Sequence, residues 1–200
     1  MIDENSQPPA IHYSRITPEA SWFVRRVCAV LVSAWLGGIL LVSLGAPAVF
    51  RAGEVVLRHP APSLARVMGK VPEDQMRDLL RYHAGEANNQ VFALWGTLQV
   101  AYGAAVLLLL VFFSNVGKLR LGLAAAMLLL ALLMKFLLIP AIAETSRLFR
   151  SSGLADVGER FRLLHGAFAA FEIASAALGL ALLWLLLGGS RSSSRRRSAV

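Results

Sequence analysis

The sequence predicts an all-α integral membrane protein, a four-helix bundle in which a short amphipathic extension of the second helix lies outside the bilayer. Hydrophobic residues make up 56% of the chain and charged residues 16%, and mean hydropathy is +0.61. This composition is unlike that of a soluble domain. Four apolar runs approach the ~20 residues that a ~30 Å hydrocarbon layer demands. They are residues 27–50, 91–113, 121–142 and 163–187. Four spans cannot close a barrel, so each is expected to be a helix.

The alternative for the first run is a cleaved signal peptide. Arg25 and Arg26 precede it, and Ala46-Pro47-Ala48 resembles a small-x-small cleavage site. Its apolar core, however, exceeds the roughly 7 to 15 residues of a signal sequence. We therefore interpret the run as a true span.

The chain divides into a polar tail, a membrane domain and a basic tail. We expect a disordered tail over residues 1–22, the four-helix domain over 23–187 and the basic tail over 188–200. Lys and Arg are dense in the short turn "SNVGKLR", before the first span and after the last one. The positive-inside rule then puts both termini in the cytoplasm. The sequence predicts a multi-pass protein of the plasma membrane, specifically a bacterial inner membrane.

The first outer loop contains the extension of the second helix. Pro72 suits the first position of a helix. Met76, Leu79, Leu80 and His83 follow the spacing of one apolar stripe. The second outer loop reads as a helix end, a Ser-Ser-Gly break and a new helix start.

Two opposite charges lie inside the spans, on consecutive helices. Lys135 is ~10 Å below the outer end of the third span, and Glu172 is ~14 Å below the outer end of the fourth. A charge at such depth usually pairs or faces a cavity. We predict a Lys135–Glu172 ion pair. The alternatives are that Lys135 extends to the interface and that Glu172 remains a neutral acid.

Further polar residues suggest a layer and a rim. Arg81, Asn88, Trp95 and Gln99 fall on one face of a helix, so Trp95 and Gln99 are candidates for a polar layer with the charged pair. Glu144 and Arg147, spaced i, i+3, can pair locally. The candidate outer rim is Arg51, Glu86, Asn88, Asn89, Glu144, Arg147, Arg162 and His165. This rim is either a solvated set of ion pairs or a mouth leading to the layer.

Two backbone features predict how the third span bends and how the spans pack. Pro140 should kink the third span beside Lys135 or end its regular part. Small residues recur every fourth position, which allows helices to approach closely. The rows are Ala34/Gly38, Gly122/Ala126 and Gly166/Ala170/Ala174.

Several classes of function lack their sequence signals. Cys28 is alone, which excludes an internal disulfide, and the basic residues are not interleaved with aromatic ones as in nucleic-acid binding. No P-loop, HExxH or G-x-S-x-G motif occurs. We expect no enzymatic activity, cofactor or metal site. The alternative is a haem or metal redox protein using His83 and His165.

Three short motifs carry a family resemblance. "GAPAVFRA" closes the first span, Pro140, Ile142 and Arg147 form a spaced element, and "FRLLHG" opens the fourth span. In this order they resemble the transmembrane protein 205-like family, also called domain of unknown function 4149. The resemblance covers residues 23–187 and implies a small four-helix membrane domain of unassigned activity. Phe168 and Glu172 depart from the small polar residues that commonly follow the "LHG" histidine in that family.

These observations predict a non-enzymatic interaction or accessory component of the membrane. Its expected partners are the lipid bilayer and a second copy of the chain or another membrane protein, with no nucleic acid. The alternative is a small oligomeric transporter or channel that conducts through Lys135, Glu172 and Gln99.

Overall fold

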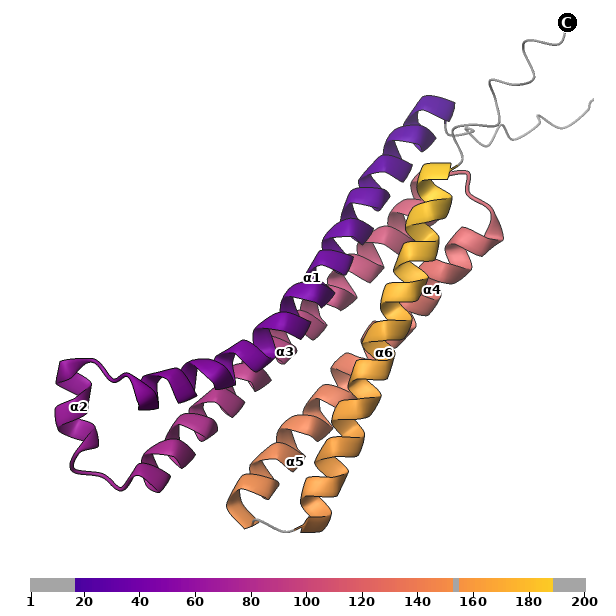
Figure 1. Ribbon diagram of the computed structural model, residues 1–200. Coiled ribbons are helices and arrows are strands. Elements are labelled where there is room, and N and C mark those ends of the chain that lie inside the picture. Colours follow the sequence, from indigo (N-terminus) through magenta and orange to yellow (C-terminus); the bar gives the residue numbers. More distant parts are fainter. Residues whose placement is uncertain (1–16, 153–154, 189–200) are drawn as a thin grey trace, which may run out of the picture.

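The computed structural model describes residues 17–152 and 155–188, and every regular element in these ranges is a helix (Figure 1). Four of the helical segments are long and apolar enough to cross a membrane. The all-α class and the four spans are therefore confirmed. In chain order the elements are α1 (Pro18–Arg58), α2 (Pro62–Met68), α3 (Glu73–Phe113), α4 (Lys118–Leu133), the π-helix η1 (Met134–Leu138), α5 (Ile139–Ser152) and α6 (Ala155–Gly188).

The long helices pack as a four-cornered bundle. α1 packs against α3 and α6, and α4 packs against the same two helices, so α3 and α6 occupy opposite corners. We call the end with the starts of α1 and α4 the basic end, because it bears Arg25, Arg26, Lys118 and Arg120. The other end holds α2 and the α5–α6 turn, and we call it the hairpin end. There the α1–α3 pair and the α5–α6 pair diverge (Figure 1).

α1 begins at Pro18, before the boundary at residue 23 that the sequence predicts. The Thr17 hydroxyl caps it by accepting a hydrogen bond from the Ala20 amide at 3.3 Å. Ser21 is buried, and its hydroxyl oxygen lies 3.4 Å from the hydroxyl oxygen of Ser114. This contact joins the start of α1 to the α3–α4 turn. Residues 18–22 therefore belong to the bundle. Most of the predicted N-terminal tail, and all but the first residue of the predicted C-terminal tail, lie outside the described residues.

α3 contains both the second span and its predicted extension. At 41 residues it is ~60 Å long, about twice the hydrocarbon thickness. Pro72 is its N-cap and Glu73 its first residue, one position later than expected. The predicted stripe is partly wrong, because Met76 and Leu80 are half-buried whereas Leu79 and His83 are exposed. Leu80 faces the end of α1 across a small pocket.

The third span changes its helical form immediately before Pro140. The Ile139 amide donates to the Met134 carbonyl, five residues back, and η1 occupies the turn between α4 and α5. Proline lacks an N–H, and its ring would press on the carbonyl four residues earlier. A π-turn widens the helix at that point. The helix does not end at Pro140, because α5 continues it to Ser152, and the irregular part is the π-turn that precedes the proline.

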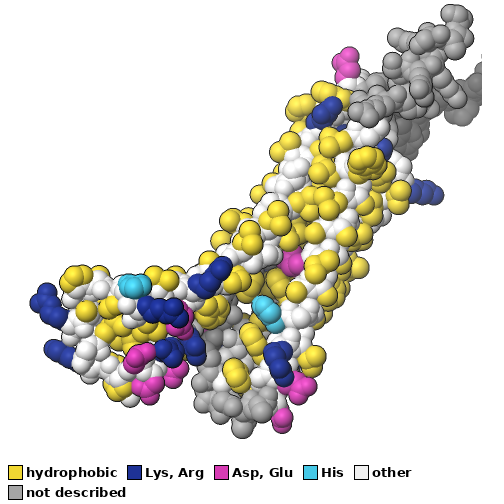
Figure 2. Space-filling view, in the orientation of Figure 1, with side chains coloured by type: hydrophobic (Ala, Val, Ile, Leu, Met, Phe, Trp, Pro, Cys, Tyr) yellow, Lys and Arg dark blue, Asp and Glu magenta, His cyan; other side chains and the backbone are white. Residues whose placement is uncertain are grey.

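The interior forms two apolar clusters, and the outside of the trunk is also apolar. The larger cluster fills the half of the bundle nearer the basic end, and the smaller one joins η1, α5 and α6. Hydrophobic side chains cover the outer surface of the trunk, while charged ones gather at the hairpin end (Figure 2). An apolar surface of this extent on a helical trunk is what a lipid environment requires.

α1 and α3 fit together through two tryptophan–glycine contacts. A methyl group added at Gly38 would collide with the ring of Trp95, and one added at Gly103 would lie 3.1 Å from the ring of Trp35. Each helix therefore provides a tryptophan that lies on a glycine of the other. The other predicted small-residue rows are wrong, because Gly122 and Gly166 have nothing within 4 Å of such a methyl group.

Gly38 and Gly37 offer a matched test of this packing. Gly38→Ala should lower the thermal stability of the detergent-purified protein, since the new methyl must displace the Trp95 ring. Gly37→Ala meets nothing within 4 Å and should be neutral or stabilising by about 0.5–1 kcal/mol from helix propensity. Equal melting temperatures for the two variants would contradict the packing described.

Candidate functional site

At the centre of the bundle, one carboxyl group accepts hydrogen bonds from uncharged side chains. Glu172 of α6 is 6% exposed. The Trp95 indole N–H donates to its Oε1 at 3.0 Å, and the Gln99 amide donates to Oε1 at 3.0 Å and Oε2 at 3.1 Å. These bonds cross the bundle axis between the opposite corners α3 and α6. The interior thus supplies the hydrogen bonds that water gives to an exposed carboxylate.

Helix geometry explains why these donors meet. Trp95 and Gln99 are four residues apart, so both point from one face of α3. Asn88, two turns before Trp95, is also buried on that face and donates to the Ala46 carbonyl of α1 at 3.0 Å. The predicted shared face is confirmed for these three residues. The ring of Trp95 lies on Gly38, which fixes the direction of its N–H.

Among the buried side-chain polar atoms that have no hydrogen-bond partner within the described part of the chain, three belong to the most deeply buried side chains. They are the Trp35 Nε1, Gln99 Oε1 and Ser175 Oγ atoms, each on a side chain that is at most 1% exposed. Ser175 is one turn from Glu172 on α6. The ring of Trp35 lies on Gly103, and Gly103 is one turn from Gln99 on α3. All three are therefore near the carboxyl group, on the side toward the basic end.

The Lys135 side chain, from η1, contacts a side of α3 other than the one that faces Glu172. Its ammonium group donates to the Ala93 carbonyl at 3.0 Å and to the Thr97 hydroxyl at 2.7 Å. Thr97 in turn donates to the Ala93 carbonyl at 2.9 Å. Thr97 is exposed and Lys135 half-buried, so the ammonium is on the lipid-facing surface of the trunk.

The predicted Lys135–Glu172 ion pair is wrong. The ion pairs among the described residues are Arg77–Glu73, Arg81–Glu54 and Arg147–Glu86, and none includes either residue. The cause is rotation around α3. Trp95 faces the bundle axis, while Thr97, two residues on and ~200° around the helix, faces outward. The depths of the two charges match the prediction, but α3 stands between them.

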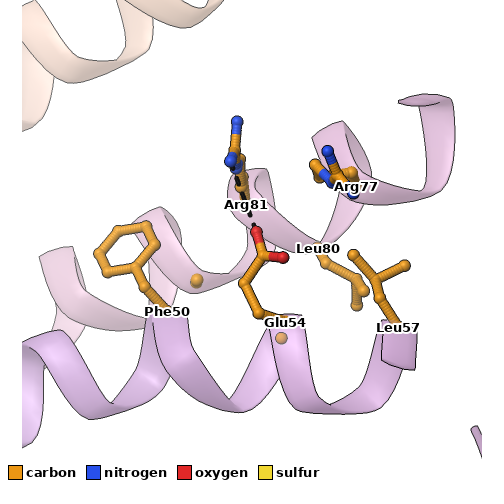
Figure 3. A pocket seen from close by; sticks show the side chains of 8 residues that line it. Phe50, Glu54, Leu57, Arg77, Leu80 and Arg81 are labelled. Carbon is orange, nitrogen blue, oxygen red and sulfur yellow. Dashed lines mark hydrogen bonds and ion pairs between the residues drawn. The ribbon is translucent and has the colours of Figure 1, made fainter. Parts of the chain in front are cut away.

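The rim residues form scattered surface contacts. Arg147 makes two hydrogen bonds to Glu86, at 3.3 and 3.1 Å, rather than the predicted local pair with Glu144. Asn89 donates to Glu86 at 3.5 Å. Arg81 and Glu54 pair at 3.4 Å beside a small pocket between α1 and α3 (Figure 3). Exposed pairs of this kind are worth about 0–1 kcal/mol, so they favour the interpretation as a solvated rim.

The remaining rim residues are exposed. The side chains of Arg51, Glu144 and Arg162 make no hydrogen bond in the described part of the chain. His165 lies against Phe161 and Phe92. His83 contacts Tyr82 instead. The described residues contain no group of three or more side chains suited to a metal ion.

The sequence placed Trp95 and Gln99 in a layer with Glu172 but missed the partners of Lys135 and the position of Ser175. The role of Thr97 could have been found, because a hydroxyl two residues from Trp95 must face away from the axis. Ser175 had a signal too, since it is three residues from Glu172 on the same helix. The Ala93 carbonyl had none, because any backbone group could serve.

Comparison of the chain with protein-family models, with curated proteins and with solved structures finds no match. The resemblance drawn from the three short motifs therefore stays a prediction, and the site must be interpreted from its own geometry.

A double-mutant cycle tests the pairing across the axis. Gln99→Leu alone removes two N–H donors from a buried carboxyl group and should destabilise by ~1–3 kcal/mol. Combined with Glu172→Leu, the loss should be smaller than the sum of the single losses. The measurement is the free energy of unfolding in detergent.

Lys135→Met with Glu172→Leu is the control cycle. Because α3 separates the two residues, their effects should add within ~0.5 kcal/mol. A coupling energy as large as that of the Gln99 cycle would contradict this separation and support a direct Lys135–Glu172 ion pair.

Proposed function

We propose that this multi-pass membrane protein is a non-enzymatic interaction component, which binds a different membrane protein through the surface around Lys135. The observation that carries the proposal is an ammonium group on the lipid-facing side of the trunk that forms no ion pair with any carboxylate of the described residues. Its cost at such depth is ~2.5–3.5 kcal/mol on insertion scales. Two hydrogen bonds offset part of this cost, and an acidic group from a partner would offset the rest.

The surroundings of Lys135 suit a transmembrane helix as the partner. An ammonium has three N–H donors, and two of them are used by Ala93 and Thr97. The side chains beside it are large, apolar and exposed: Leu94 is 63% exposed and Phe136 is 65% exposed. Gly96 lets η1 approach α3 closely, with the Lys135 Cδ 3.3 Å from a methyl group added there. The result is an apolar surface with one cationic donor.

The partner is inferred to be a different protein because this chain has no exposed acid within its predicted spans. Glu172 is the sole Asp or Glu within residues 27–50, 91–113, 121–142 and 163–187. It is buried on the bundle axis. A dimer of this chain through the same surface would bring two ammonium groups together without a counter-charge. Charge complementarity favours a helix that carries Asp or Glu at the depth of Lys135.

The orientation proposed is with the basic end in the cytoplasm. Arg25, Arg26, Lys118 and Arg120 of the described residues lie there, and Glu19 is the acid closest to them in sequence. The membrane is proposed to be the plasma membrane, of the bacterial inner-membrane type. We further propose the transmembrane protein 205-like family as a relative, on the motifs quoted above.

The two alternatives have less support. Conduction through a Lys135–Glu172–Gln99 layer needs those groups to line one path, but α3 separates the lysine from the other two. The interior between Glu172 and the basic end is mainly apolar, although Ser175 and the Trp35 indole N–H lie in it. A haem site between His83 and His165 would need both rings to approach, yet each contacts a different aromatic side chain.

Photo-crosslinking in native membranes tests the proposed partner surface. A photoreactive residue at Phe136 should give a crosslinked product that Lys135→Met reduces at least tenfold, because the counter-charge of the partner then loses its cation. The same residue at Trp184, which is 78% exposed on α6, should not give this product. Lys118→Met, near the basic end, is the charge control.

Mass spectrometry of the product completes the test. The crosslinked partner segment should be a different transmembrane helix with an Asp or Glu, and its replacement by Asn or Gln should reproduce the Lys135→Met loss. A crosslink to a second copy of this chain, or one unaffected by Lys135→Met, would overturn the proposal.

A further inference from the structure

The surroundings of Glu172 contain no charge that would hold it permanently ionised. α3 presents the neutral Trp95 and Gln99. α1 and α4 present no charged side chain within residues 27–50 and 121–133. On η1, Lys135 is engaged on the far side of α3. On α5, which also packs on α6, Glu144 and Arg147 are exposed. On α6, His165 is the nearest titratable group, two turns away and exposed.

The Gln99 amide can serve either protonation state of this carboxyl group. Its NH₂ faces Glu172, while its buried carbonyl oxygen has no partner within the described chain. Two N–H donors suit a carboxylate. A neutral acid needs an acceptor for its O–H, and turning the amide by 180° supplies the carbonyl oxygen. The NH₂ would then point to the side where Ser175 Oγ also lacks a partner.

We propose that Glu172 is a reversible proton-binding site of this membrane domain, with Gln99 as the residue that adapts to its two states. On uptake, a proton from water forms an O–H bond on the carboxyl group and the negative charge disappears. On release, the proton returns to water and Gln99 turns its NH₂ back toward the carboxylate. No other bond is made or broken.

The proton reaches Glu172 from the hairpin end. Toward the basic end, beyond Ser175 and the Trp35 indole, buried apolar side chains such as Val32, Val106 and Leu182 fill the interior. Toward the hairpin end, a small half-open pocket is lined by Asn89, Phe92, Ile139, Ile142, His165 and Phe168. Phe168, which lines this pocket, is one turn from Glu172 on α6. Access from one end alone makes the site a binding site, not a conducting path.

Infrared difference spectroscopy of the full-length protein in lipid nanodiscs tests the proposal. The chain has twelve Asp and Glu residues, so acidic buffer produces several carboxylic-acid carbonyl bands, and the band of Glu172 is the component that disappears in Glu172→Gln. This component should shift in heavy water and persist in Glu144→Gln, at an exposed position. Identical acid bands in the wild-type protein and in Glu172→Gln would overturn the proposal.

Gln99→Leu keeps the test decisive if Glu172→Gln fails to fold. It retains the acid but removes the amide, so the carbonyl band should persist at a higher frequency because the acid has lost a hydrogen-bond partner. An unchanged frequency would remove Gln99 from the mechanism.

In proteoliposomes, the wild-type protein should not dissipate a pH gradient. A leak that Glu172→Gln abolishes would overturn one-sided access and favour conduction.

Discussion

The structure depends on one constraint: a carboxyl group at the centre of an apolar bundle must find its hydrogen bonds within the protein. Water is scarce there, and an unsatisfied group costs several kcal/mol. Glu172 meets this requirement through Trp95 and Gln99, which reach it across the axis. This contact joins opposite corners that otherwise touch little. It also fixes the rotation of α3, and that rotation decides which other residues of α3 face lipid.

The tryptophan–glycine contacts follow from the same constraint. Trp95 can direct its N–H toward Glu172 only if its large ring has a place on α1, and Gly38 supplies it. Trp35 makes the reciprocal contact with Gly103, so the antiparallel α1 and α3 are tied at two levels. In a membrane, where lipid is as apolar as a leucine side chain, such close contacts replace the hydrophobic drive between helices.

The sequence predicted the depth of each polar group but not its direction around the helix. Span lengths follow from hydrophobic runs, and the residue count along a helix gave Lys135 and Glu172 matching depths. Rotation is decided by packing across four helices, and long apolar runs with alanine and glycine on every side carry little signal for it. That is why the ion pair was wrong, while the Asn88–Trp95–Gln99 face, defined within one helix, was right.

The π-helix at Met134–Leu138 sets the helical phase of the third span. A π-turn adds one residue without advancing the axis by an equal amount, so every later side chain is turned by ~100° relative to an unbroken α-helix. Homologous chains that differ by one residue in this segment would therefore present different faces beyond it, even with identical flanking sequences. An alignment that treats such a gap as neutral would equate lipid-facing positions with interior ones.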